Sequence, residues 1–250
     1  MIPFRTTAPG AQMPVVTMSL IVANIAVFFY QLDLPPPVEM RFLYTYALVP
    51  AVYTDPELAR HAGLNPFNYW PILTNTFMHG GWLHLIFNMW TLWLFGLAVE
   101  GRMSRFRFLA FYLLCGMLGS LGHLAFNLGS TVPALGASGA IAGLLGGYGR
   151  LFPGARVSLI QPIFVFPVIF SVPAIVYTLV WFGLQLWQGT ASLGVGAGGG
   201  GIAWWAHIAG FLAGLALITP LGGKRWRAPP KGPSGLSLKR GPWSRRGPWS

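Results

Sequence analysis

The chain has 250 residues, of which 54% are hydrophobic and 8% are charged. A soluble domain usually carries about 25% charged residues, so this composition excludes an ordinary soluble globular protein and indicates a polytopic membrane protein. The formal net charge of +11 would favour nucleic-acid binding in a soluble protein. In a membrane protein, however, the positions of the basic residues set the topology. We therefore expect the lipid bilayer as partner and no nucleic acid.

Six apolar segments follow in chain order, and each is expected to form a helix. They cover about residues 15–32, 81–99, 106–126, 138–152, 165–187 and 202–221. Most have about the 20 residues needed to cross roughly 30 Å of hydrocarbon. The fourth is shorter, so we expect the loop before it to dip into the bundle, where protein and water surround it. The sequence therefore predicts an all-α polytopic membrane protein in which residues 15–221 form one six-helix domain.

The basic residues predict the orientation of this bundle. With a cytoplasmic N-terminus, 14 of the 16 Lys and Arg residues lie on the cytoplasmic side, and only Arg41 and Arg60 lie outside. This asymmetry follows the positive-inside rule, so both termini are expected in the cytoplasm. Residues 1–14 then form a cytoplasmic N-terminus, and a loop of about residues 33–70 lies outside. Residues 222–250 are rich in Pro, Gly and basic side chains, which predicts a disordered cytoplasmic tail.

Two polar residues stand in glycine-rich apolar surroundings. Ser138 belongs to a Gly-Ala-Ser-Gly sequence at the start of the fourth segment, and His207 to an Ala-His-Ile-Ala-Gly sequence in the sixth. A polar side chain in hydrocarbon is costly unless it has a partner or lines a wet cavity. Because a hydroxyl and an imidazole together make a nucleophile and its base, we expect Ser138 and His207 to form a catalytic pair.

His84 and Asn88, in the second segment, are four residues apart and share one face of a helix. The expected topology places both at the same depth as Ser138, where they could donate hydrogen bonds to an oxyanion. No Asp or Glu occurs in segments three to six, and Glu100 lies 16 residues past His84, about 24 Å along a helix. That is the wrong side of the membrane, so the sequence favours a Ser-His dyad over a triad with an acid.

Glycines accompany both members of the pair at helical spacing. Small residues repeated every four positions let membrane helices approach backbone to backbone. We expect such packing between the fourth and sixth segments, where it would bring the serine and the histidine within hydrogen-bond reach. The expected close-packing glycines are Gly136, Gly139, Gly143, Gly210 and Gly214.

Two other kinds of chemistry compete with this interpretation. Four histidines could bind a metal, but no His-Glu-x-x-His motif occurs and no carboxylate is near, so we expect neither a metal nor a cofactor. A histidine relay for transport usually includes intramembrane acids, which are missing here. His79 and His123 are better explained as interfacial or hydrogen-bonded structural residues.

Over about residues 70–215 the chain resembles the rhomboid family of intramembrane serine proteases. The resemblance is carried by the His-x-x-x-Asn of His84 and Asn88, the Gly-x-Ser-Gly of Ser138 and the Ala-His-x-x-Gly of His207. It implies a six-helix fold with Ser138 as nucleophile and His207 as general base. The implied oxyanion site comprises His84, Asn88 and the Ser138 amide. The implied substrates are transmembrane segments of membrane proteins, cleaved near the outer leaflet, with segment five and the loop after it as gate.

The likeness to bacterial members implies that the protein lies in the inner or plasma membrane. Two positions nevertheless depart from the family pattern. Many members carry Trp-Arg where this chain has Trp70-Pro71, and many carry an aromatic residue where it has Ala142. Close backbone packing of segment six is expected to hold the histidine ring instead. Retention of both Ser138 and His207 favours a protease over the alternative, a non-proteolytic relative that binds client helices.

Overall fold

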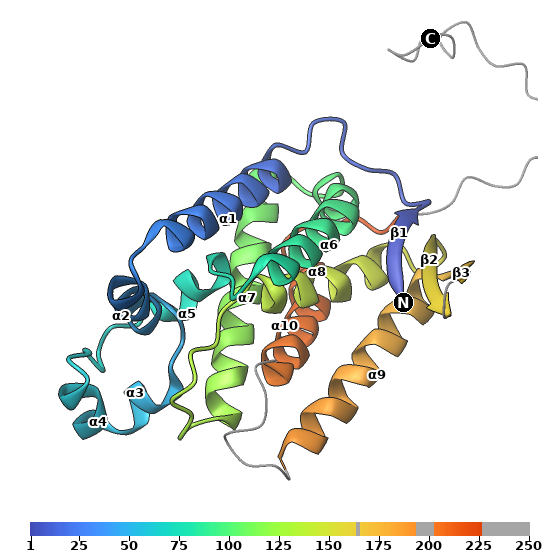
Figure 1. Ribbon diagram of the computed structural model, residues 1–250. Helices are drawn as coiled ribbons and strands as arrows, with labels where there is room; N and C mark the ends of the chain where they lie inside the picture. Colours follow the sequence, from blue (N-terminus) through green and yellow to red (C-terminus); the bar gives the residue numbers. More distant parts are fainter. Residues whose placement is uncertain (164–165, 194–202, 227–250) are drawn as a thin grey trace, which may run out of the picture.

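The structure, a computed structural model, describes residues 1–163, 166–193 and 203–226, and most of these are helical (Figure 1). The longer helices are α1 (Val15–Asp33), α6 (Trp82–Glu100), α7 (Arg105–Phe126), α8 (Ser138–Leu151), α9 (Ala174–Ser192) and α10 (Trp204–Leu217). The shorter ones are α2 (Pro36–Tyr46), α3 (Pro50–Thr54), α4 (Pro56–His61), α5 (Pro71–Thr74) and the 3₁₀ helix η1 (Asn75–Phe77). The strands are β1 (Ile2–Thr6), β2 (Arg156–Ile163) and β3 (Phe166–Pro173).

Helix α8 is the centre of the bundle. All of its residues except Ser138 and Arg150 are buried, as expected for a helix with neighbours on every side. Helices α6, α7, α9 and α10 pack around it. The largest fully buried aromatic side chains of this core are Phe28, Phe95, Phe108, Phe111, Tyr112, Tyr148, Phe152 and Phe211.

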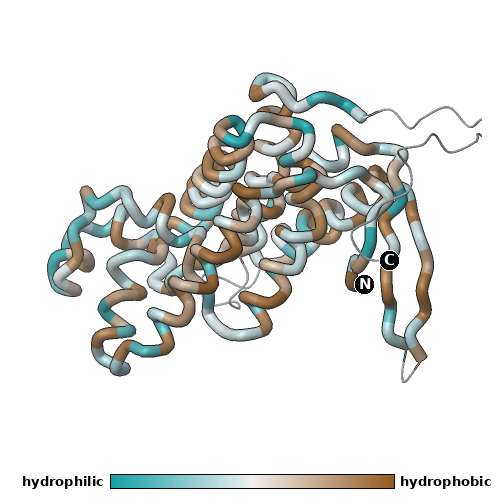
Figure 2. Tube along the Cα trace, turned by 90° about the horizontal axis from the view of Figure 1, so that it is seen from above, coloured by the Kyte–Doolittle hydropathy of each residue, from teal (hydrophilic) through white to brown (hydrophobic). Residues whose placement is uncertain are grey.

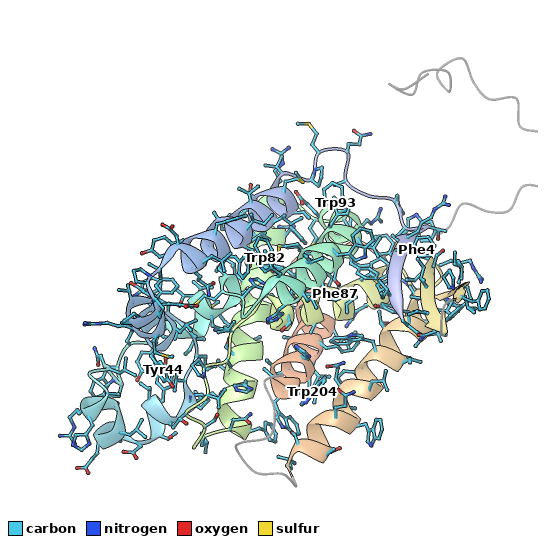
Figure 3. The ribbon with its side chains drawn as sticks, in the orientation of Figure 1. Phe4, Tyr44, Trp82, Phe87, Trp93 and Trp204 are labelled. Carbon is cyan, nitrogen blue, oxygen red and sulfur yellow. The ribbon has the colours of Figure 1, made fainter. Side chains whose placement is uncertain are left out.

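Among the described residues, three helices are long and apolar enough to cross a membrane, namely α1, α6 and α7. Apolar side chains also cover their outer faces: Trp82, Phe87 and Trp93 of α6 are 52%, 49% and 43% exposed (Figure 3). An apolar surface of this extent fits contact with lipid. Helices α8 and α10 have 14 residues each, or about 21 Å. The six expected spans are therefore not all matched by helices of spanning length.

A three-stranded antiparallel sheet, with β2 between β1 and β3, corrects the all-α prediction. Strands β2 and β3 form a hairpin in which Arg156 pairs with Pro173 and Ile163 with Phe166. The segment 165–187 was expected as one helix, but its residues 166–173 are a strand. Its Val, Ile and Phe residues favour a strand, and the residue before each proline is disfavoured in a helix. Hydrophobic residues run along this hairpin as they do along the helices (Figure 2).

The N-terminal residues, expected only as a cytoplasmic segment, contain β1 and tie the sheet to the bundle. The Thr6 hydroxyl forms a hydrogen bond with the Tyr148 hydroxyl on α8. The Trp90 indole of α6 donates to the Pro3 carbonyl at 2.6 Å. These contacts attach the sheet to the end of the bundle opposite the short helices of residues 33–70 (Figure 1).

The predicted outer loop, residues 33–70, contains helices α2, α3 and α4. The Asp55 side chain caps α4 by accepting hydrogen bonds from two backbone amides. The Tyr53 hydroxyl donates to the Asn68 carbonyl at 3.0 Å. Burial, followed by the proximity of Tyr69, raises the pKa of Tyr53 to about 12, so this phenol stays a donor at neutral pH. The segment is therefore a compact folded structure.

Glu100, the last residue of α6, binds the start of α1. It is 4% exposed. Its carboxylate accepts hydrogen bonds from the Val16 amide at 3.0 Å and from the Thr17 amide and hydroxyl at 2.8 and 2.6 Å. The first amides of a helix lack partners within the helix, and the helix dipole favours a negative charge there. Glu100 therefore caps α1 and joins it to α6.

Glu100→Ala is expected to destabilise the protein, because two amides and a hydroxyl lose a charged acceptor. Hydrogen bonds to charged groups contribute about 1.5–3 kcal/mol each, so we expect a loss of about 2 kcal/mol or more. Thermal unfolding in detergent measures it. Glu57→Ala is the matched control, since this side chain is 79% exposed and, within the described part of the chain, its one ion pair is with Arg60. Equal melting temperatures of the two variants would contradict the capping role of Glu100.

Candidate active site

Ser138 is the first residue of α8, and backbone hydrogen bonds fix the loop that leads to it. Leu48 and Ala134 exchange two of them, at 2.9 and 2.8 Å, and the Gly136 amide donates to the Asn75 carbonyl at 2.9 Å. Gly136 has a φ of 130°, in the region that side-chain-bearing residues rarely adopt. The loop thus places the serine hydroxyl in a defined position at the end of the central helix.

The Trp70-Pro71 step lies close to this loop. Pro71 is the first residue of α5, where proline is favoured because the missing N–H would have no partner in the helix. The Asn75 side-chain amide donates to the Pro71 carbonyl and to the Ser120 hydroxyl of α7, the latter at 2.9 Å. Neutral hydrogen bonds therefore anchor this segment to the bundle.

His207, in the first turn of α10, contacts the serine directly. Its Nε2 lies 2.8 Å from the Ser138 Oγ, and its Nδ1 lies 2.7 Å from the Gln185 Oε1 of α9. The Trp181 and Trp204 rings lie 5.9 and 6.0 Å from the imidazole, centroid to centroid. Figure 3 shows Trp204 on α10, facing the space between α10 and α9. The structure thus brings together the two residues that the sequence predicted as a pair.

Glycines bring α8 and α10 into backbone contact at this point. A Cβ atom added to Gly210 would lie 2.1 Å from the Gly139 carbonyl oxygen, and one added to Gly214 would lie 1.8 Å from that of Gly143. No side chain larger than hydrogen fits at such separations. The Ser138–His207 contact therefore depends on the missing side chains of both helices.

His84 and Asn88 border the turn before the serine. A Cβ atom on Gly136 would lie 2.7 Å from the His84 Nε2 and 3.7 Å from the Asn88 Nδ2, so glycine leaves the space that both side chains occupy. The Asn88 Nδ2 also lies 3.0 Å from the Nε2 of the buried His79. An amide nitrogen carries two donors, so this contact leaves one free.

A small cavity adjoins the serine from the side of α7. It has a volume of about 20 Å³, and Ser138, Asn75, Ser120 and His123 are among the residues that line it. A cavity needs about 10–15 Å³ and several polar partners to hold a water molecule. The cavity therefore has the size and lining for one water molecule beside Ser138.

Sequence reasoning missed three residues of this site. Gln185 and Trp181, four residues apart on one face of α9, both reach His207. The signal was an amide in an otherwise apolar segment, but only acids were considered as partners for the histidine. His79, interpreted as structural, contacts Asn88, and its backbone amide donates a hydrogen bond to the Gln31 side-chain oxygen.

Two other sequence predictions concern a metal site and segments near the C-terminus. The part of the chain that the structure describes contains no group of three or more His, Cys, Asp or Glu side chains placed to bind a metal ion. Of the loop after segment five, expected to form part of a substrate gate, residues 194–202 lie outside the described residues, as do residues 227–250 of the predicted tail.

Comparison with known proteins agrees with these observations. The model of the Rhomboid domain matches residues 66–224, a stretch that includes the whole candidate site. Rhomboid protein 1, mitochondrial, of Saccharomyces cerevisiae is 34% identical over 155 residues, 60% of this chain and 39% of the yeast protein.

Two relatives from Bacillus subtilis carry protease names. Rhomboid protease GluP is 45% identical over 78 residues, 31% of this chain and 15% of GluP. Putative rhomboid protease YdcA is 33% identical over 97 residues, 39% of this chain and 48% of YdcA. The matches span less than half the length of each of these relatives. Because the domain model covers more than half of the chain, the protein belongs to the rhomboid family of membrane proteins.

Proposed function

We propose that this protein is an intramembrane serine endopeptidase that cleaves transmembrane segments of other membrane proteins. The observation that carries the proposal is the 2.8 Å hydrogen bond between the Ser138 Oγ and the His207 Nε2. A nucleophile within hydrogen-bond reach of its base is the arrangement that acyl transfer requires. Family membership and the names of two relatives support the same reaction class.

In the proposed reaction, Ser138 attacks the scissile carbonyl carbon and its proton passes to the His207 Nε2. The tetrahedral intermediate collapses when the imidazolium returns this proton to the leaving amine, which leaves an acyl-serine. Water then attacks the ester, with His207 again accepting a proton. The second intermediate expels the Ser138 oxygen, which takes this proton back from His207, and the carboxylic acid product is released. The cavity of about 20 Å³ beside Ser138 is a source for that water.

The negative charge of the intermediate requires hydrogen-bond donors next to the serine. Ser138 opens α8, so its backbone amide has no acceptor within that helix. His84 and the free donor of Asn88 lie at the Gly136 turn, on the same side. We assign these three groups to the oxyanion site, where preorganised donors act most strongly.

The proposal extends to the membrane arrangement. Residues 15–221 form a six-helix domain in a bacterial plasma membrane, with both termini in the cytoplasm. The asymmetric placement of Lys and Arg supports this orientation. Ser138 then lies in the outer half of the bilayer, and the substrate is cleaved near its outer surface. Residues 222–250 serve as a basic cytoplasmic tail without a part in catalysis.

The test uses the full chain purified in detergent, with a labelled model transmembrane substrate and a fluorophosphonate probe. We expect wild-type protein to cleave the substrate and to react covalently with the probe, and Ser138→Ala to do neither. Labelling makes the result independent of the choice of substrate. Binding of the substrate, with neither cleavage nor labelling of the wild type, would support a non-proteolytic client-binding protein instead.

His84→Ala and Asn88→Ala are expected to lower kcat more than they raise KM, because oxyanion donors act mainly in the transition state. Loss of an essential donor costs about 100-fold or more in kcat. Steady-state cleavage kinetics measure both constants. Thr91→Ala is the control on the same helix, since the one hydrogen bond of its hydroxyl to the described residues is to the Phe87 carbonyl of its own helix. A double variant of His84 and Asn88 with the wild-type kcat would refute the assignment.

A further inference from the structure

Gln185 is a buried amide in the middle of an apolar helix. It lies on α9 and is 7% exposed. Burying an amide is costly unless its polar atoms are paired, so its contact has to be accounted for. Its Oε1 lies 2.7 Å from the His207 Nδ1, on the side of the ring opposite Ser138.

The chemistry of the imidazole gives this contact a direction. The Ser138 hydroxyl can donate its proton to the His207 Nε2 only when that nitrogen carries none. In the neutral ring the proton then resides on Nδ1, which becomes a donor and needs an acceptor. The Gln185 amide oxygen, at 2.7 Å, is placed to accept it. The chain of hydrogen bonds therefore runs from Ser138 through His207 to Gln185.

We propose that Gln185 is a positioning residue that holds the His207 ring in the Nδ1-protonated tautomer and oriented toward Ser138. This inference rests on the proposed function. Gln185 takes the place that an acid occupies in a serine-histidine-acid triad. A neutral amide offers the acceptor oxygen without a charge, and a buried charge in the membrane is far more costly.

The packing of α9 against α10 supports this role. Trp181, one turn before Gln185 on the same face, lies 5.9 Å from the imidazole, centroid to centroid. One turn after it, Gly189 is close enough to α10 that an added Cβ would lie 2.9 Å from the Ile208 Cδ1. The two helices thus approach closely where the amide reaches the ring. Helix α9 supplies both a hydrogen bond and an aromatic surface to His207.

The test compares three substitutions of Gln185. Gln185→Met keeps the length of the side chain without an acceptor, Gln185→Asn withdraws the amide by one methylene group, and Gln185→Glu keeps an acceptor oxygen in place. We expect the first two to lower kcat about tenfold or more with little change in KM. Gln185→Glu should retain clearly more activity than either. Gln188→Met is the matched control on the same helix, because its Oε1 has no hydrogen-bond partner among the described residues.

A spectroscopic measurement separates positioning from stability. In protein with ¹⁵N-labelled histidine, two-bond couplings show which ring nitrogen of His207 carries the proton. We expect Nδ1 in wild type, Gln185→Glu and Gln188→Met, and a mixture of tautomers in Gln185→Met and Gln185→Asn. An unchanged Nδ1-protonated ring in both latter variants would overturn the proposal. Failure of the proposed function would give a different result. The wild-type protein itself would then neither cleave the substrate nor react with the probe at Ser138.

Discussion

Ser138→Ala and His207→Ala should each reduce substrate cleavage to background, and combining them should add little. The two side chains share a hydrogen bond of 2.8 Å and act as one unit in the proposed reaction. Without the hydroxyl there is no nucleophile, and without the imidazole the hydroxyl keeps its proton. Removing either member of such a pair costs about as much as removing both, commonly about 10⁶-fold in kcat. Initial rates of all four proteins measure this.

Two exposed residues provide matched controls for these substitutions. Ser104→Ala and His61→Ala remove the same groups from positions on the surface, in the loop before α7 and in α4. Both should cleave at the wild-type rate, and all variants should melt as wild type does. Two outcomes would show that Ser138 and His207 do not work together. In one, the losses of activity in the two single variants multiply in the double variant, and in the other, either single variant keeps full activity.

The sequence was sufficient to predict the contact between Ser138 and His207. Each polar residue stands in an apolar segment, and the alternating direction of successive segments puts both at one depth. His84 and Asn88 follow from the same argument with a helical spacing of four. Such reasoning succeeds because the bilayer removes most alternatives: a polar group in hydrocarbon requires a partner, and few partners share its depth.

The sheet was not predictable in this way. Hydropathy treats the stretch 165–187 as one apolar segment, yet its first part is a strand and its second part helix α9. Apolarity alone does not separate a short apolar strand from a helix. Strand β2 pairs with β1, which is more than 140 residues away along the chain. Local patterns carry no information on such a pairing.

Gln185 was missed for a related reason. Whether an amide on α9 faces His207 depends on the rotation of two helices about their axes. That rotation is set by details of packing such as the approach at Gly189. The sequence showed a polar residue in an apolar segment but not its partner. An acid is not required at this position, because an imidazole Nδ1–H needs only an acceptor.

Gly210→Ala should both destabilise the protein and slow cleavage strongly. The added Cβ would lie 2.1 Å from the Gly139 carbonyl oxygen, a backbone atom that cannot rotate away. Helices α8 and α10 must then separate, and overpacking of this kind costs about 1–3 kcal/mol. Gly139 adjoins Ser138, so the separation also lengthens the hydrogen bond to His207. A misplacement of about 1 Å at reacting groups can cost about 100-fold in rate.

The matched control for Gly210→Ala is Gly183→Ala on α9, where, apart from the backbone of its own helix, no atom of the described residues lies within 4 Å of an added Cβ. Alanine in an exposed helix stabilises by about 0.5–1 kcal/mol relative to glycine, so this variant should melt at or above the wild-type temperature and cleave normally. Thermal unfolding and cleavage rates of both variants separate a general effect of alanine from a local one. If Gly210→Ala melted and cleaved like Gly183→Ala, close packing of α8 and α10 would not set the distance between Ser138 and His207.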